Sequence, residues 1–403
     1  MLVDGLKDQA QALNPGETWA AVKQHRKNGE AAAAISLLQG LCAAHPTDPR
    51  FVMCMAELLL QEGRLEECEP YLGRAQAIRG LEPDMAERLG WVGLRHRFLS
   101  LEKAGKPAEI IAAYHHVVHE APESVRRIEE WAAIVNRAGQ ALYQRNGERA
   151  GDGAQAIINK VRERGIAIRS FDQIVGDQRL LEELQAVART TDDWTVPGKP
   201  HFFKAIREEE AVASHPIMRA GLHPALLEIA NGFYELYTRL VSANIVLTRT
   251  DASDDRQRRG SEGWHRDPED TPMFKIFIYL NDVTELSHGP FQYVPASRPG
   301  GKYEYLMPRF GRGRYDPSYK TKPDWAQADR EIDPADVVTV FGRAGAMFFC
   351  DTSGFHRGGY CTSQDRFMVT YVYQRPGSQY PSYIKCAVGD DAPVAVRMAV
   401  QPL

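Results

Sequence analysis

The sequence predicts an α+β protein in two parts, a helical region over residues 1–160 and a β-rich region over residues 161–403. From about residue 16 to residue 160, apolar side chains recur every three or four residues among Ala, Leu, Glu, Gln and Arg, which is the period of an amphipathic helix. From about residue 161 the apolar segments become short and are separated by turn-forming residues, which is typical of antiparallel strands in a barrel or sandwich.

Four glycines divide the helical region at similar turns. They are Gly29, Gly63, Gly105 and Gly147, separated by 34, 42 and 42 residues. After each of the first two glycines, small or apolar residues follow at the fifth and ninth positions. This spacing resembles the tetratricopeptide repeat, which pairs two helices in a period of 34 residues. The resemblance is clearest in the first two units, and an irregular helical bundle is the alternative.

The β-rich region is expected to open with a short strand at 165–168 and a helix at 177–190, followed by a second helix at 223–242. The expected strands then cover 244–250, 273–280, 289–295, 337–341, 346–350 and 366–374. Two connecting segments, 251–260 and 300–336, are rich in Arg and Gly and are expected to be loops.

Two histidines and one aspartate form a candidate metal site in the β-rich region. His265 and Asp267 are two residues apart, so on an extended strand both side chains point to the same face. His356 comes 89 residues after Asp267, with predicted strands between them that a folded sheet can bring together. Two imidazoles and one carboxylate are the ligand set of non-haem Fe(II) oxygenases, which leaves three coordination positions open. The alternative is that these are ordinary polar residues near a turn.

Two cationic residues accompany this triad. Arg366 follows His356 by ten residues and opens an apolar strand. Its guanidinium can hold a carboxylate with two parallel hydrogen bonds, as an anchor for 2-oxoglutarate requires. Lys275 shares one face of its strand with Phe277 and Tyr279. Because a charged lysine is costly in a closed core, we expect it to be a second contact to 2-oxoglutarate or to the substrate, with a solvent-facing lysine as the alternative.

The block from about Trp264 to Arg375 resembles the phytanoyl-CoA dioxygenase family of Fe(II)/2-oxoglutarate oxygenases. The matching features are Trp-His-x-Asp at 264–267, a strand that runs into Asp282-Val283, Gly-Pro followed by Pro-x-Ser at 289–297, and His356 with Arg366 ten residues later. Ala296 and Arg298 depart from the usual Gly and His of the family. The resemblance implies a double-stranded β-helix, or jelly roll, with iron at its open mouth.

The resemblance also implies the chemistry. Fe(II) would bind His265, Asp267 and His356, and Arg366 would hold the far carboxylate of 2-oxoglutarate. The reaction would release succinate and CO₂ and hydroxylate an unactivated C–H bond of the substrate. Related halogenases have a small residue in place of the carboxylate ligand, so Asp267 favours hydroxylation or another non-halogenating oxidation. Two alternatives stay open: a tetratricopeptide scaffold with a degenerate, partner-binding barrel, and a cupin-like metal enzyme that does not use 2-oxoglutarate.

Composition limits the compartment and the partners. A net charge of −4 gives no reason to expect nucleic-acid binding, and no apolar run is long enough to span a bilayer. The N-terminus lacks the features of a signal peptide. The six cysteines are scattered, so we expect free thiols in a reducing cytoplasm.

The substrate is left open between a small molecule and a group presented by a protein or carrier. Helical repeats usually bind peptides or proteins, so the helical region is expected to bind a protein partner, a carrier-bound substrate or a second copy of the chain. The two Arg-rich segments are expected to be either substrate-contacting loops at the barrel mouth or solvated surface loops.

Overall fold

The computed structural model describes residues 14–120, 128–191, 194, 203–205, 211–250, 260–267, 270–298, 300–306, 323–378 and 384–400. The chain divides into two compact units, Met1–Lys106 and Pro107–Leu403. This division falls earlier than the boundary at residue 160 expected from the change in composition, because the later helices pack with the sheet-containing unit.

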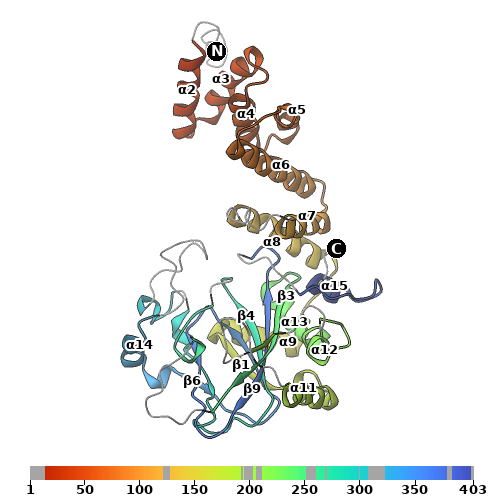
Figure 1. Cartoon of the computed structure of the whole chain (residues 1–403), viewed down its shortest axis with the longest axis vertical. Coiled ribbons are helices and arrows are strands. Elements are labelled where there is room, and N and C mark those ends of the chain that lie inside the picture. Colours follow the sequence, from red (N-terminus) through yellow and green to blue (C-terminus); the bar gives the residue numbers. More distant parts are fainter. Residues whose placement is uncertain are drawn as a thin grey trace. The chain divides into compact units, whose positions relative to one another are not determined.

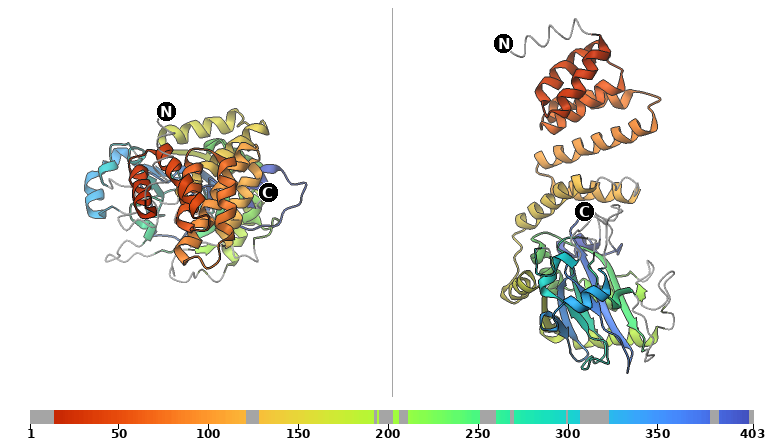
Figure 2. Two further views of the ribbon diagram at one scale, coloured as in Figure 1. Left: turned by 90° about the horizontal axis from the view of Figure 1, so that it is seen from above. Right: turned by 90° about the vertical axis from the view of Figure 1, so that its left-hand side faces the viewer.

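The first unit consists of paired helices. Within its described residues these are α2 (Pro15–Lys27), α3 (Ala31–Ala44), α4 (Pro49–Gln61), α5 (Leu65–Ala77) and α6 (Pro83–Lys103). Successive helices lie side by side and share one apolar core (Figure 2). Gly29, Gly63 and Gly105 follow α2, α4 and α6 with φ of 76°, 70° and 67°, a left-handed conformation that glycine adopts without strain. The predicted turns at these glycines are confirmed, while the tetratricopeptide assignment stays a prediction.

The second unit combines helices with two antiparallel sheets. Its described helices of four or more residues are α7 (Pro107–Glu120), α8 (Ile128–Arg145), α9 (Asp152–Arg164), α10 (Phe171–Ile174), α11 (Gln178–Thr190), α12 (Pro216–Gly221), α13 (Pro224–Tyr234), α14 (Trp325–Glu331) and α15 (Val394–Val400). Short 3₁₀ turns lie at η3 (Gly260–Glu262), η4 (Pro295–Ser297), η5 (Glu304–Leu306) and η6 (Pro334–Asp336).

The larger sheet has the strand order β1-β7-β4-β9-β3-β2, and the smaller sheet has the order β6-β5-β8 (Figure 1). The strands are β1 (Ile166–Ser170), β2 (Phe203–Ala205), β3 (Arg239–Thr248), β4 (Phe274–Tyr279), β5 (Phe291–Tyr293), β6 (Val338–Val340), β7 (Ala346–Asp351), β8 (His356–Gly358) and β9 (Arg366–Gln374). From β4 to β9 the chain passes repeatedly between the two sheets, so residues far apart in sequence meet in the space between them.

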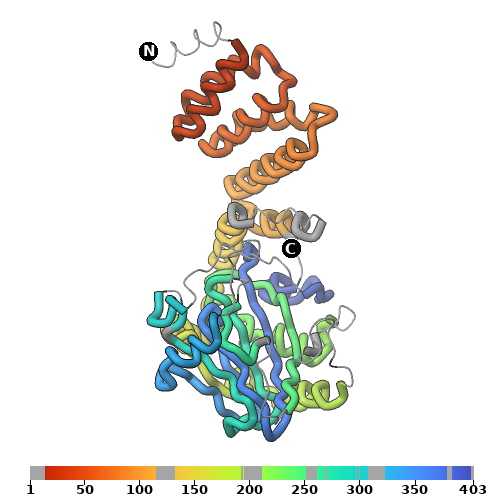
Figure 3. The backbone as a smooth tube through the Cα atoms, turned by 60° about the vertical axis from the view of Figure 1, so that its left-hand side comes forward, coloured from red at the N-terminus to blue at the C-terminus, as the bar shows by residue number. Residues whose placement is uncertain are grey.

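The two faces of the larger sheet have different partners. One face packs against α9, α11, α12 and α13 and contributes Phe274, Ile276 and Ile278 from β4. The other face packs against the smaller sheet and contributes Phe277 and Tyr279. In Figure 3, as in Figure 1, α11 and α14 lie on opposite sides of the strands. The predicted alternation of faces along this strand is therefore confirmed.

Several boundaries differ from the prediction. The helix expected at 223–242 ends at Tyr234, because Glu235 adopts a left-handed conformation with φ of 57°. The chain then enters β3, whose residues pair with β9 along its whole length. Strands β2 and β8 and helices α10, α12, α14 and α15 had no counterpart in the prediction, and α14 lies within the segment 300–336 that was expected to be a loop. Residues 251–259 and 307–322 of the two Arg-rich segments lie outside the described residues.

Within the described residues, no helix combines the length and the hydropathy needed to cross a membrane. All six cysteines are buried and free, as their scattered spacing predicts.

Candidate metal centre

Backbone hydrogen bonds bring the two histidine segments together. His265 lies in the segment between η3 and β4, and His356 is the first residue of β8. The N–H of each histidine donates to the carbonyl oxygen of the other, at 3.1 and 3.0 Å. The N–H of Asp267 donates to the carbonyl oxygen of Thr352 at 3.0 Å. These bonds fix the position of Asp267 relative to the histidine that follows it by 89 residues.

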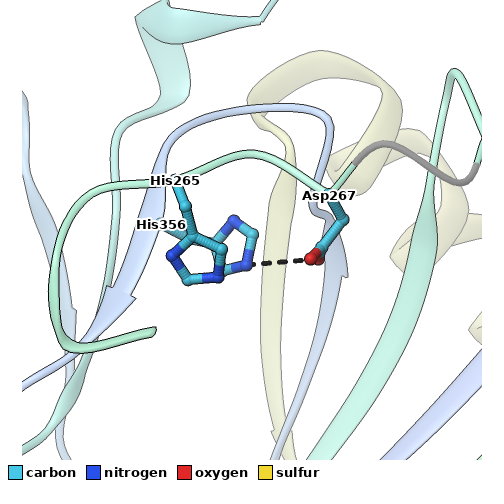
Figure 4. Close-up of side chains that lie close together, drawn as sticks. All are labelled: His265, Asp267 and His356. Atoms are coloured by element: carbon cyan, nitrogen blue, oxygen red, sulfur yellow. Dashed lines mark ion pairs between the residues drawn. The ribbon is translucent and has the colours of Figure 1, made fainter. Parts of the chain in front are cut away.

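The three side chains converge on one point (Figure 4). One potential ligand atom from each of His265, Asp267 and His356 lies within 4.8 Å of the other two. Nε2 of His356 is 3.2 Å from Oδ2 of Asp267, and the centroids of the two imidazole rings are 4.1 Å apart. One metal ion can therefore bind all three side chains.

The second nitrogen of each imidazole is already occupied. Nδ1 of His265 is 2.9 Å from the carbonyl oxygen of Gly263, and Nδ1 of His356 is 3.0 Å from that of Gly354. A carbonyl oxygen only accepts, so Nδ1 carries a proton in both rings and Nε2 is the nitrogen left for a metal ion. Metal-binding histidines are oriented by this kind of hydrogen bond.

The surroundings favour the protonation states that a metal ion requires. Burial, with a smaller effect from His356, lowers the pKa of His265 to about 3, so its imidazole is neutral. Burial opposes ionisation of Asp267, but Lys275, His356 and His265 outweigh it and hold the pKa of this carboxyl well below its usual value. Neutral imidazole and ionised carboxylate are the forms that bind divalent cations.

Lys275 points into the space between the sheets. Its Nζ lies 2.7 Å from Oδ2 of Asp267, and its side chain is only 14% exposed. The solvent-facing alternative is therefore wrong. This ammonium group is thus paired with a residue of the triad, and its expected contact with a co-substrate stays a prediction.

Arg366 is a buried cation with unused hydrogen-bonding capacity. The residue is 3% exposed, and its Nη2 donates to Oγ1 of Thr248 at 2.9 Å. Nε and Nη1 are buried, and within the part of the chain that the structure describes they have no hydrogen-bond partner and no carboxylate pairs with the guanidinium. Burial of an unpaired charge is costly, so this arrangement calls for an anionic ligand.

The guanidinium lies further into the space between the sheets than the triad does. Arg366 pairs with Thr248, and Tyr279, the last residue of β4, pairs with Met368. The triad lies at the other end, where β4 begins and β8 starts. A Cβ atom on Gly358 would lie 2.8 Å from Nη2 of Arg366. Since two residues of a strand span about 6.6 Å, His356 and the guanidinium are separated by roughly that distance along β8.

Two residues singled out in the sequence have structural roles. Arg298 donates to the carbonyl oxygens of Val161, Arg162 and Glu163 at the C-terminal end of α9, where a cation is favourable. It thereby ties the loop after β5 to this helix. Trp264 is 1% exposed and belongs to a separate apolar cluster that includes residues of α14.

Two residues beside Arg366 were not identified from the sequence. Thr248 meets Arg366 across 118 residues, and no local pattern marks it. Gly358 belongs to the Gly-Gly pair that follows His356 and Arg357, and a glycine so close to a ligand is a recognisable sign of close packing.

No protein-family model matches the sequence, and no curated protein matches it. The chain is similar in structure to HygX from Streptomyces hygroscopicus with nickel and 2-oxoglutarate bound, at 17% identity and a TM-score of 0.41, over 61% of this chain and 95% of that one. It is also similar to the epimerase SnoN from nogalamycin biosynthesis in complex with Fe³⁺, alpha ketoglutarate and nogalamycin RO, at 17% identity and a TM-score of 0.39, over 62% and 95% of the chains. The non-heme alpha ketoglutarate dependent carbocyclase SnoK is 21% identical, with a TM-score of 0.36, over 54% and 83%. At these values the likeness by itself decides neither the fold nor the activity of the chain.

Proposed function

We propose that the second unit is an Fe(II)- and 2-oxoglutarate-dependent oxygenase. The observation that supports this most directly is the pairing of a convergent His-Asp-His cluster with a buried, incompletely bonded guanidinium further into the same space. A structural ion pair would supply Arg366 with a carboxylate of the protein, whereas a co-substrate site leaves it for the ligand.

His265 and His356 would hold the ion through Nε2, and Asp267 would hold it through its carboxylate. When bound, the ion together with 2-oxoglutarate and O₂ supplies an oxidation coupled to the formation of succinate and CO₂. Arg366 would bind the far carboxylate of 2-oxoglutarate through the guanidinium N–H groups that do not donate to Thr248, and Thr248 would keep the guanidinium in place. Lys275 would add positive charge between the triad and this anchor.

The finer assignments belong to the same proposal. We infer that the two sheets form a double-stranded β-helix, since β4 to β9 pass between them with the triad at one end. The phytanoyl-CoA dioxygenase family, and hydroxylation of an unactivated C–H bond, are the most specific forms of the proposal. The helices of the first unit are proposed to bind a protein partner, a carrier-bound substrate or a second copy of the chain.

Succinate release is the test. The full chain with Fe(II), 2-oxoglutarate and O₂ should release succinate slowly even without substrate, and His265→Ala should abolish this release. A mass-spectrometric screen should then find products 16 mass units heavier with the wild type alone. If wild type and His265→Ala release equal amounts of succinate with every substrate mixture, the rival interpretation, a barrel that only binds a partner, is favoured.

A further inference from the structure

The residues on either side of the two histidines form a layer behind the metal centre. Trp264 and Phe355 precede His265 and His356, and Arg266 and Arg357 follow them. Because side chains alternate along extended backbone, these four residues point away from the side on which the histidines converge. Trp264, Arg266 and Phe355 are almost completely buried there.

Each arginine of this layer stacks on the aromatic ring of the opposite segment. Cζ of Arg357 lies 4.1 Å from the centroid of the Trp264 ring, and Cζ of Arg266 lies 4.3 Å from that of Phe355. These are the pairs that stand opposite each other when His265 pairs with His356. Such cation–π contacts are strongest when desolvated, so the two segments hold each other in register from behind.

Helix α14 binds both segments through one carboxylate. Oδ1 of Asp329 accepts a hydrogen bond from Nε1 of Trp264 at 3.2 Å and another from Nη1 of Arg357 at 2.9 Å. Trp264 adjoins the first histidine of the triad, and Arg357 adjoins the second. A single side chain of α14 therefore links the backbone of one proposed ligand to that of the other.

A second residue of α14 reaches the hydrogen bond that orients His265. Nε1 of Trp325 donates to the carbonyl oxygen of Trp264 at 3.0 Å. The Trp325 ring also lies against Gly263, where an added Cβ atom would come within 2.1 Å of it. The carbonyl oxygen of Gly263 is the acceptor for Nδ1 of His265. The ring of Trp325 thus restricts the peptide that fixes the imidazole.

The apolar cluster around α14 is built on the same two aromatic residues. It contains Trp264 and Phe355 together with Ala328 of α14 and residues from the segments before and after that helix: Val294, Tyr303, Leu306 and Ile332. This cluster is separate from the main core between the larger sheet and its helices. Displacement of α14 would expose both aromatic residues, so the packing of this helix and the position of the histidine segments depend on each other.

We propose that α14 is a positioning element for the metal centre and that Asp329 is its principal residue. Asp329 acts through Trp264 and Arg357, and it touches neither the ion nor a reacting atom. With α14 in place, the two Nε2 atoms are held at one separation before the ion arrives, which raises the affinity for the ion. This inference rests on the proposed function, because it assumes that the triad binds a metal ion.

The test uses Co(II) alone, with calorimetry for affinity and visible absorption for ligand geometry. Replacement of outer residues that orient metal ligands usually weakens binding by about 10- to 100-fold, and Asp329→Ala should lie near the lower limit, about tenfold, with an altered Co(II) spectrum. Asp329→Asn keeps one oxygen acceptor and should fall between Ala and wild type. The matched control is Glu331→Gln on the same helix, whose carboxylate accepts from Tyr305 and Gln327 and contacts neither histidine segment. It should stay within about twofold of wild type.

The outcomes separate the two proposals. If the wild type fails to bind one Co(II), or if His265→Ala binds it equally well, the metal site itself is wrong. If the wild type binds Co(II) and both Asp329 variants match it in affinity and spectrum, α14 has no positioning role. Circular dichroism checks the fold of each variant. Should Asp329→Ala fail to fold, Trp325→Phe is tested in its place. This variant keeps a ring against Gly263 and removes only the N–H that donates to the carbonyl oxygen of Trp264. If both Trp325→Phe and Asp329→Asn leave the Co(II) affinity and spectrum unchanged, the proposal is overturned.

Discussion

Two arginines lie at the two ends of β9, and they differ in whether a carboxylate pairs with the guanidinium. Arg375, directly after the strand, forms an ion pair with Asp270, whose carboxylate is 2% exposed, and its Nε donates to both carboxylate oxygens at 3.1 and 3.0 Å. Arg366, the first residue of the strand, is as deeply buried as Asp270, but its hydrogen-bond partner among the described residues is a hydroxyl group. The arginine at one end of the strand is therefore paired with a carboxylate, and the arginine at the other end has no such partner among the described residues.

The comparison distinguishes a structural cation from one kept for a ligand. Both residues are arginines at the ends of β9, so residue type and local sequence do not show which of them is paired. The Asp270–Arg375 pair joins the segment that follows the triad to the end of β9, and it needs nothing further. The missing partner of Arg366 is what a bound carboxylate would supply. We therefore expect substitutions at the two ends to affect different properties.

The largest effect should follow Arg375→Ala. It leaves the Asp270 carboxylate buried without its partner, and breaking a buried pair in this way costs about 3–5 kcal/mol of unfolding free energy. Denaturant unfolding measures this loss. Arg366→Ala is the control and should not lower the unfolding free energy in this way, since it removes a buried charge that has no carboxylate partner among the described residues. Equal losses for the two variants would contradict the comparison.

The loss in Arg375→Ala should also depend on pH. Burial raises the pKa of Asp270 above its ordinary value even though Arg375 opposes this shift, and removal of the guanidinium raises the pKa further. A carboxyl group with a raised pKa in the folded state favours folding when protonated, and that contribution is lost as the pH rises. The difference from wild type should therefore be larger at pH 8 than at pH 5. If the difference in unfolding free energy between wild type and Arg375→Ala instead grew toward pH 5, the prediction would be wrong.

The next effect concerns ligand binding. Loss of a buried, bidentate charge contact costs several kcal/mol, so Arg366→Ala should weaken 2-oxoglutarate binding by roughly two to three orders of magnitude. Affinity for Co(II) should change far less than affinity for 2-oxoglutarate, because the guanidinium bonds to Thr248 and is not one of the three groups that could hold the ion. Arg366→Lys should restore only part of the affinity, since an ammonium group cannot reproduce the planar fork. Unchanged 2-oxoglutarate binding in Arg366→Ala would place the anchor elsewhere, with Lys275 as the first candidate.

Gly358→Ala should have a smaller effect on the same measurement. The added methyl group would lie 2.8 Å from Nη2 of Arg366 and would displace the guanidinium without removing its charge. We expect 2-oxoglutarate affinity to fall by about tenfold, between wild type and Arg366→Ala, because the two-bond geometry is disturbed. Gly359→Ala is not a suitable control, because its added methyl group would collide with the backbone of neighbouring residues. The double variant with Arg366→Ala serves instead and should bind no worse than Arg366→Ala alone.

The smallest effect is expected for Lys275→Met. This change removes the ammonium group that pairs with Asp267 and competes with a metal ion for Oδ2. Removal of a neighbouring positive charge should strengthen Co(II) binding by about threefold to tenfold, which corresponds to roughly 1 kcal/mol. The 2-oxoglutarate affinity should fall by less than in Arg366→Ala. Weaker Co(II) binding would instead mean that Lys275 mainly orients the Asp267 carboxylate.

Local spacing made much of the site predictable. The two-residue interval of His265 and Asp267 places both side chains on one face, whatever the rest of the fold. Alternation along β4 placed Lys275 on the same face as Phe277 and Tyr279, and the structure bears this out. Positive φ at the helix-ending glycines likewise follows from residue type, because glycine alone adopts this backbone conformation freely.

Other features depend on contacts between distant segments. The helix expected to reach residue 242 stops at Tyr234 because β3 pairs with β9, which lies more than 100 residues later. The unit boundary moves to residue 106 because helices that look like part of a repeat pack with the sheets. The role of Asp329 could not be inferred either, since an aspartate on a short, exposed helix carries no local mark of the two segments it joins.

The sequence by itself thus determined the chemical groups of the site, which are two imidazoles, a carboxylate and two cations. It also predicted the face of the strand on which several of these side chains lie. The tertiary structure decided which of the charges are paired. Arg366 and Arg375 look alike in sequence, and only the fold supplies Asp270 to one of them and leaves the other facing the space beside the triad. The reason is physical, because pairing depends on distances across the sheet, and these are set by strand order and register rather than by neighbours along the chain.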